Sequence, residues 1–385
     1  MNTIFFLFKK TIKNKFNIFP ILLFIICISI FLFGNNQAIK TLNLKTEITQ
    51  NLSSANSQIE QTKQQLKSTD VTSNMYSALQ QTLSDTTLAA ERYRTSLAAL
   101  KNNDWRLAYP PIIAQLTDDL KVMQNPKSQT PNDLKENVSH NLLMIKALYT
   151  RNLPFEDPDY PIKAMTFTVS MLQIVFPIAF PLVIVYILSL LFSGLYRDRL
   201  NLELLSPKSK LGSTFLSLST GVGLSTILCF TFIIFTFVIS FIFFGAGSLR
   251  FPILTYSFLN QGMYFQDISN VIVPSLILLF LEIIFITIVT YLFAYIFRER
   301  MVSFFTSLLI ITGFTFLPNF IEPMQKIAVY LPTTYINGVS VVTGQYANSL
   351  NNFSISFGSG LTSLTVSIAI MLIILWFTQE NIKKN

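Results

Sequence analysis

A compact charged turn, YRDRLNLELLSPKSKLGS at residues 196–213, separates two of the most apolar segments of the chain. It combines guanidinium and carboxylate groups with a leucine pair, and its Ser206-Pro207 step stops any preceding helix. Such a turn suits either a short helix along the membrane surface that docks a soluble partner or an ordinary positively charged loop. The choice depends on which side of a membrane the turn occupies.

The chain carries few other residues that could do chemistry. It has no G-x-x-x-x-G-K-[ST] phosphate loop, no H-E-x-x-H zinc motif and no G-x-S-x-G nucleophile motif. The single histidine, His140, has no companions at metal-site spacing. Cys27 and Cys229 fall within apolar runs, where a small buried side chain is the usual role. The sequence therefore predicts no enzyme and no metal site.

Glu282, in the apolar run LLFLEIIFIT, is the one carboxylate within a predicted span. An ionised carboxylate in hydrocarbon is costly, so we expect it to face the bundle interior, a partner subunit or water. Two roles stay open, a structural hydrogen bond and a contact on a substrate path. A proton relay is disfavoured because no second ionisable group accompanies it.

The composition of the chain predicts the helices that position these residues. The 385 residues are 51% hydrophobic and 12% charged, unlike an ordinary soluble domain. Since about 20 helical residues cross a bilayer, we predict an all-α integral membrane protein with six transmembrane helices, the second to sixth within 164–385. The apolar runs lie at 18–34, 165–195, 215–244, 271–297, 301–317 and 361–377. Pro177 and Pro181 predict a bend in the second span.

Residues 1–34 are expected to form an amphipathic helix followed by the first transmembrane helix. In IFFLFKKTIKNKF, apolar residues recur at spacings of three and four, and lysines lie mostly on the other face. Such a helix rests on the inner membrane surface, as a basic anchor or as an elbow that touches a partner. The run that follows lacks a small-residue cleavage site, so we expect a retained helix rather than a signal peptide.

The distribution of Lys and Arg predicts the orientation, because cytoplasmic loops carry their excess. With both termini cytoplasmic, the basic residues inside are Lys9, Lys10, Lys13, Lys15, Arg197, Arg199, Lys208, Lys210, Arg298, Arg300, Lys383 and Lys384. The formal net charge of +8 is thereby explained by membrane insertion and requires no nucleic-acid partner. We expect a multi-pass protein of the plasma membrane, with the aromatic loop at 245–270 outside.

Two larger regions also fall outside in this orientation. Residues 35–163 are hydrophilic, and the heptad-like spacing of apolar residues within 48–83 predicts helical hairpins. Further helices are expected at 111–124 and 131–152, with disorder as the alternative for part of this extracellular domain. Residues 318–357 are semi-apolar and broken by prolines, so a re-entrant or interfacial helix pair is expected before the sixth span.

The stretch RDRLNLELLSPKSKLG resembles the cytoplasmic loop of ABC-2-type transporter permeases, in which a charged start, E-L-L, P-x-S and a following basic residue recur. It departs from the commoner E-x-G-T at Arg199, Leu200 and Asn201. The layout is also similar, with six spans, an insertion after the first helix, and YLPTTYINGVSVVTG before the last. The resemblance is to the membrane subunit of a type V-like ABC exporter.

This resemblance implies that residues 196–213 form a coupling helix resting in a groove of a separate ATPase subunit. By position, the ATPase-facing residues would be Asp198, Arg199, Glu203, Leu204 and Leu205, with Pro207 ending the helix. Arg298 and Glu299 would be secondary contacts, unless they are an ordinary basic flank. ATP and Mg would be bound by the ATPase partner and no cofactor by this chain.

The resemblance also implies further partners and a function. A second copy of this permease, or a related permease, would complete the transport path within membrane lipid. The function would be export of an amphiphilic or hydrophobic substrate such as a peptide, a lipid or a drug-like molecule. The alternative is a cell-surface scaffold or receptor resembling the phage-infection-protein group, which also has a large outer domain after the first of six spans. The turn at 196–213 favours the transporter.

Overall fold

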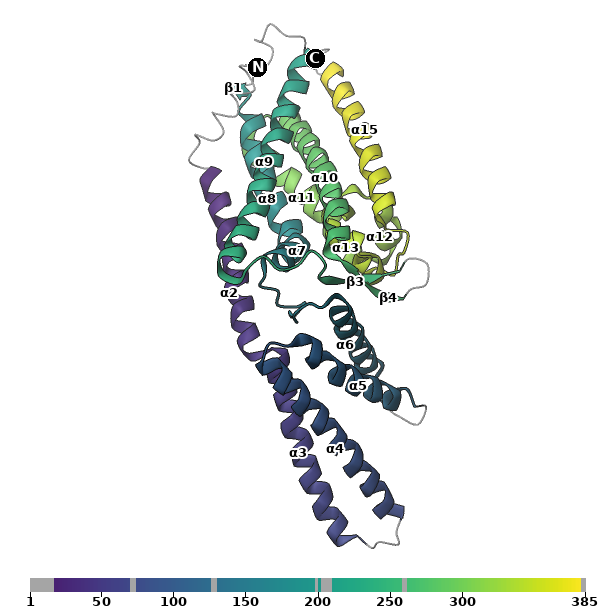
Figure 1. The fold of residues 1–385 in the computed structure, drawn as a ribbon. Coiled ribbons are helices and arrows are strands. Elements are labelled where there is room, and N and C mark those ends of the chain that lie inside the picture. Colours follow the sequence, from purple (N-terminus) through teal and green to yellow (C-terminus); the bar gives the residue numbers. More distant parts are fainter. Residues whose placement is uncertain are drawn as a thin grey trace.

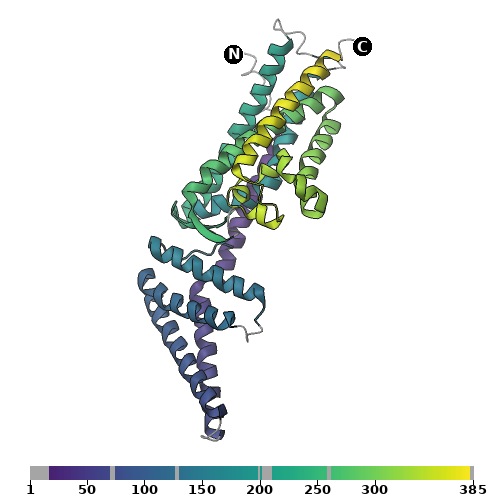
Figure 2. The same ribbon diagram turned by 90° about the vertical axis from the view of Figure 1, so that its right-hand side faces the viewer.

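The computed structural model describes residues 17–69, 74–125, 130–197, 200–201, 210–257 and 262–381. Within these residues the molecule is elongated, with a bundle of apolar helices at one end and a narrow helical projection at the other (Figures 1 and 2). Nearly all of its secondary structure is helical. The amphipathic helix predicted before the first span lies outside the described residues.

Among the described residues, six helices are long and apolar enough to cross a membrane. They are α2 (Ile18–Thr41), α8 (Phe176–Ser193), α9 (Lys210–Phe244), α10 (Ile268–Phe297), α11 (Arg300–Phe320) and α15 (Phe357–Asn381). Each coincides with one of the predicted apolar runs. The prediction of a helical membrane protein is therefore confirmed.

The second predicted span is divided in two. α7 (Ala164–Ile174) and α8 are separated at Val175, two residues before Pro177. Proline has no backbone N–H to donate, and its ring crowds the preceding turn. The Gln173 carbonyl oxygen, four residues before Pro177, accepts a hydrogen bond from the Asn337 side-chain amide instead, at 2.9 Å. The helix is thus interrupted on the N-terminal side of Pro177, in the span for which a bend was predicted.

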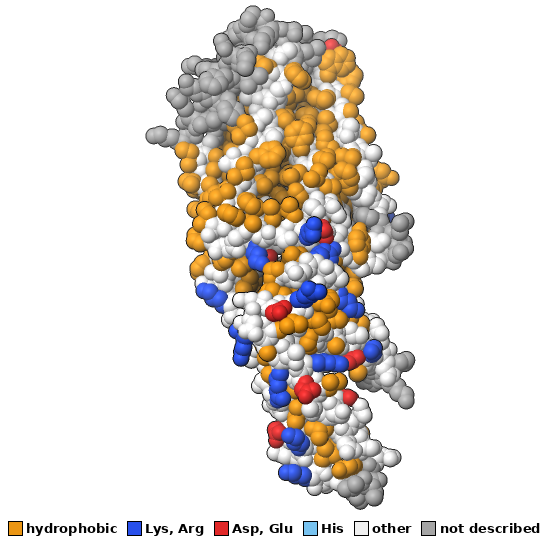
Figure 3. Space-filling view, in the orientation of Figure 1, with side chains coloured by type: hydrophobic (Ala, Val, Ile, Leu, Met, Phe, Trp, Pro, Cys, Tyr) orange, Lys and Arg blue, Asp and Glu red, His pale blue; other side chains and the backbone are white. Residues whose placement is uncertain are grey.

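The centre of the bundle is formed by α8 and α10. In the most apolar segment of α8, 72% of the residues are buried, and in that of α10, 56% are buried. In those of α2, α9, α11 and α15 the buried share is only 17–22%. A broad apolar band with almost no charged side chains covers the visible face of the bundle (Figure 3). Helices with all backbone groups paired internally and apolar outer faces fit a lipid surrounding.

The projection consists of two helical hairpins, as predicted for this part of the chain. α3 (Leu44–Ser68) packs along α4 (Asn74–Lys101), and α5 (Trp105–Gln124) packs along α6 (Asn132–Arg151). Ala55 and Ile59 of α3 form a small apolar cluster with Ala90 of α4. This cluster is separate from the main core, which agrees with the sparse apolar spacing of the sequence.

The base of the projection shares one hydrophobic core with the membrane helices. Leu44, Ile48, Tyr109 and Leu148 belong to the same continuous cluster of buried residues as α8 and α10. Tyr109 is fully buried, and its hydroxyl donates to the Leu153 carbonyl oxygen at 2.7 Å. The α5–α6 hairpin is therefore packed onto the bundle rather than tethered to it by a linker.

The loop at 245–270 contains a β-hairpin that was not expected from its sequence. β3 (Pro252–Tyr256) pairs antiparallel with β4 (Met263–Asp267), placing Leu254 opposite Phe265. The β-branched and aromatic residues of PILTY and MYFQD favour extended backbone. The hairpin contacts α6 on the projection and α14 (Gln345–Ser349) near the bundle.

The segment predicted to form a helix pair at 318–357 contains a chain of shorter elements instead. After α11 come α12 (Glu322–Ile327), η3 (Ala328–Tyr330), η4 (Pro332–Ile336), α13 (Gly338–Val342) and α14. Pro323 and Pro332 each lie in the first turn of an element, where a missing N–H costs nothing. These elements pack on α10, α11 and α15.

Candidate functional site

The turn at 196–213 is only partly helical in the structure. β1 (Tyr196–Arg197) pairs antiparallel with β2 (Leu200–Asn201), and α9 begins at Lys210. The prediction of a helix over the turn is therefore wrong for residues 196–197 and 200–201, because strand pairing holds their backbone extended. The other predicted coupling residues, Asp198, Arg199, Glu203, Leu204, Leu205 and Pro207, lie outside the described residues.

The structure brings the two predicted inner turns together. The guanidinium carbon of Arg298 lies 6.0 Å from the centre of the Tyr196 ring. The Tyr196 ring meets the Tyr295 ring edge-on, with centroids 6.3 Å apart. Arg298 ends α10 in a left-handed conformation with φ 57°, and Glu299 directly precedes α11. Both turns therefore lie at the same end of the bundle, next to each other.

Glu282 lies in the middle of α10 and is 0% exposed. Neither carboxylate oxygen has a hydrogen-bond partner among the described residues. The side chain faces the bundle interior within a single chain, which is one of the three surroundings expected for it, and does not face a partner subunit. A buried polar group without a hydrogen bond does not stabilise a fold. The arrangement therefore argues against a structural hydrogen bond within this chain.

Further polar groups without partners occur on the helices that pack against α10. Within the described part of the chain, these are the hydroxyls of Thr168 on α7, Ser189 on α8, Thr226 on α9, Ser303 and Ser307 on α11, and Thr333 and Thr334 on η4. Unpaired buried groups of this kind are uncommon in protein interiors. Water or a ligand would satisfy them. The interior around α10 is thus more polar than spans that only fill a bilayer require.

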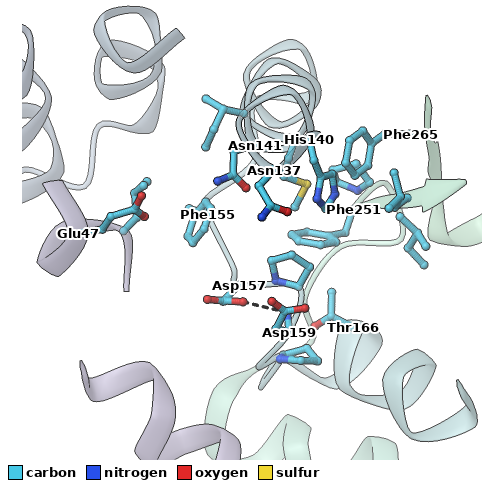
Figure 4. Close-up of a pocket in the computed structure, with 18 of the residues that line it drawn as sticks. Glu47, Asn137, His140, Asn141, Phe155, Asp157, Asp159, Thr166, Phe251 and Phe265 are labelled. Atoms are coloured by element: carbon cyan, nitrogen blue, oxygen red, sulfur yellow. Dashed lines mark hydrogen bonds between the residues drawn. The ribbon is translucent and has the colours of Figure 1, made fainter. Parts of the chain in front are cut away.

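A cavity of about 690 Å³ lies where the projection meets the bundle. Its walls come from α3, α5, α6, the connection at 152–163, α7 and the β3–β4 hairpin. Figure 4 shows Glu47 on one side and the connection carrying Asp157 and Asp159 on the other, with Phe155, Phe251 and Phe265 around the space. The His140 ring stacks on Phe265, with ring centroids 5.5 Å apart.

The connection that forms one wall is held by Glu156. This side chain is only 5% exposed, and its Oε1 accepts hydrogen bonds from the amides of Ile162 and Lys163 at 3.0 and 2.8 Å. The same oxygen accepts from the Thr166 hydroxyl at 2.7 Å. A carboxylate at the beginning of a helix satisfies amides that have no partner within the helix. The wall is therefore fixed to the start of α7.

The carboxylates of the cavity differ from Glu156 in having few partners. Burial raises the pKa of Asp157; the amide of Asp159 opposes this, and the charge of Asp159 reinforces it. Burial also raises the pKa of Glu47, and the charge of Asp157 adds to this shift. Burial lowers the pKa of His140, so its imidazole is neutral at neutral pH. In the described residues, no group of His, Cys, Asp and Glu is arranged to hold a metal ion.

No protein-family model matches the chain, and no curated protein or solved structure matches it. The residues and their geometry therefore carry the functional argument.

Proposed function

We propose that the chain is the membrane subunit of an ATP-binding cassette exporter in the plasma membrane. A separate ATPase subunit binds ATP and Mg and docks on the cytoplasmic turns at 196–213 and 298–299. The chain moves an amphiphilic or hydrophobic substrate outward, and a second copy or a related permease completes the path. In this proposal the α3–α6 projection faces the exterior, and the elements of 318–357 lie at the outer membrane surface.

The observation that carries the proposal is the contact between Arg298 and Tyr196. An ATPase that drives a membrane subunit must engage loops at one end of the bundle. The two turns with the relevant charged residues meet there, and Tyr196 also contacts Tyr295 of α10. Since α10 carries the buried Glu282, a displacement of these turns would reach the bundle interior along one continuous helix.

Copurification with an ATPase tests the proposal. The tagged chain, isolated from its native cells in mild detergent, should capture a nucleotide-binding subunit identifiable by mass spectrometry. Glu203→Arg should abolish that capture, because an unpaired charge in a buried contact typically costs several kcal/mol. Lys208→Ala, a change expected at the rim of the contact, should capture the ATPase at wild-type levels.

Membrane insertion is measured for each variant, so that loss of capture is not confused with misfolding. Capture of the ATPase by Glu203→Arg at wild-type levels would show that the coupling assignment is wrong. A wild-type chain that is isolated intact but never with an ATPase would favour the scaffold or receptor class instead.

A further inference from the structure

The cavity between the projection and the bundle has the size of a small-molecule site. Its volume of about 690 Å³ lies within the roughly 300–1,000 Å³ of ligand pockets. It is built from segments far apart in the sequence, from Leu44 on α3 to Gln345 on α14. Pockets of this kind occur preferentially where two structural units meet.

The charge of the lining has one sign. Glu47, Asp157 and Asp159 line the cavity, whereas no Lys or Arg is among its described lining residues. None of the three carboxylates forms an ion pair within the described part of the chain, in which the ion pairs use Glu60, Asp118 and Asp267. The cavity therefore holds negative charge that no basic group of its walls neutralises.

The remaining walls combine apolar and aromatic side chains with neutral polar ones. The polar ones include Asn51, Gln115, Asn137, Asn141 and Gln173. Phe155, Phe251 and Phe265 line the space together with aliphatic side chains of α3, α5 and α6. The faces of aromatic rings attract cations, most strongly where water is displaced. The Nε2 atom of His140, also in the lining, is buried without a hydrogen-bond partner among the described residues. An unsatisfied atom of this kind in a cavity wall is one that water or a ligand would complete.

We infer that this cavity binds a lipophilic organic cation, a molecule with one positive charge on an apolar body. The carboxylates of Glu47 and Asp157 supply the charge partners, and the phenylalanine walls contact the apolar part. A bare metal ion fits poorly, since the described carboxylates and His140 are not grouped as metal ligands. As a binding site the cavity is independent of the proposed export function, whereas its ligand is cargo only if that function holds.

The test uses two probes of nearly equal size and opposite charge. The full chain in lipid nanodiscs is dialysed against tetraphenylphosphonium or tetraphenylborate, with empty nanodiscs measuring partition into lipid. We expect the cation to bind at least about tenfold more tightly than the anion, because the two charges experience opposite fields from the carboxylates. Binding should weaken on acidification as Asp157 takes up a proton.

Two matched variants locate the site. The double variant Glu47→Gln, Asp157→Asn should weaken tetraphenylphosphonium binding at least about tenfold. Asp118→Asn should leave binding unchanged, because Asp118 lies outside the cavity lining and pairs with Arg92 at 2.9 Å. Equal binding of both probes, or wild-type binding by a folded double variant, would overturn the inference.

The outcomes for the site and for the export function are distinguishable. Cation binding without a copurifying ATPase would leave the site standing and remove its role in export. An ATPase complex that binds neither probe above the lipid background would leave the export function standing and remove the site.

Discussion

Arg151 and Asp267 form an ion pair with an Nε–Oδ1 distance of 2.8 Å that joins the projection to the bundle. Arg151 lies in the last turn of α6, and Asp267 directly precedes α10. The Arg151 guanidinium also donates to the Ala147 carbonyl oxygen at 3.1 Å, which holds it in place. The pair therefore links the cavity wall on α6 to the helix that carries Glu282.

Breaking this ion pair should loosen the junction. The side chains of Arg151 and Asp267 are 22% and 31% exposed, so the pair is less screened than one on the open surface. In a double-mutant cycle with Arg151→Met and Asp267→Asn, we expect a coupling free energy of about 1 kcal/mol, read from thermal unfolding in detergent. The exposed pair Lys63–Glu60 serves as the control and should show almost no coupling. Additive effects of the two junction variants would contradict the prediction.

The stability of the junction should depend on pH through Asp157. Its pKa is raised in the folded protein, chiefly by burial, so the ionised form is penalised there. At neutral pH, Asp157→Asn should therefore raise the unfolding temperature. This advantage should shrink as the pH falls through the raised pKa and vanish below about 4, the ordinary value, because the wild-type carboxyl is then protonated in both states.

Asp118→Asn provides a control of opposite sign for the pH experiment. The hydrogen bond from Arg92 holds the pKa of Asp118 below its usual range, so its contribution to stability is present above about pH 4 and lost below. Between pH 5 and 7.5 the pH stays at least about one unit above that ordinary value. Over this range the free energy of unfolding of Asp118→Asn should be lower than that of the wild type by a constant amount. An Asp157→Asn effect that does not shrink between pH 7.5 and about pH 4, the ordinary value, would refute the assignment.

Hydropathy predicted the membrane helices well because each span is a local pattern. The same holds for α5 and α6, whose periodicity and flanking prolines indicated helices at 111–124 and 131–152. The β3–β4 hairpin was missed because prolines and a few aromatic residues in a short segment do not distinguish a strand from a loop. The cavity had no sequence signal at all, since Glu47, His140 and Asp157 come from separate elements that only the tertiary structure brings together.

The close approach of α13 to α10 should depend on Gly338. A Cβ atom there would lie 2.7 Å from the Ser275 carbonyl oxygen, and backbone cannot yield as a flexible side chain can. Gly338→Ala should therefore destabilise the folded chain by about 1–3 kcal/mol, as overpacking does in well-packed interiors. Gly313→Ala is the control, because a Cβ at Gly313 meets open space. Equal unfolding temperatures for the two variants would show that the α13–α10 contact relaxes freely.

The orientation of the chain is testable by cysteine labelling in intact cells. In a variant lacking Cys27 and Cys229, a cysteine at Ser68 should react with an impermeant maleimide added outside, because the end of α3 is expected to be extracellular. A cysteine at Ser209 should react only after the cells are opened, since the basic turn is expected to be cytoplasmic. The reverse pattern would overturn both the orientation and the proposed ATPase contact.

Glu282 should matter for transport more than for folding. Its carboxylate is fully buried in α10 and has no hydrogen-bond partner among the described residues, so Glu282→Gln removes a charge without removing a stabilising contact. Under the proposed export function, we expect normal membrane levels and a several-fold loss of ATPase activity in the purified complex in nanodiscs, because intramembrane carboxylates usually lie on a substrate or ion path.

Thr287→Val is the matched control: Thr287 is equally buried in α10, but its hydroxyl donates to the Ile283 carbonyl oxygen at 2.7 Å within the helix. Full activity of Glu282→Gln, or a loss of membrane levels in that variant, would return the residue to a purely structural role.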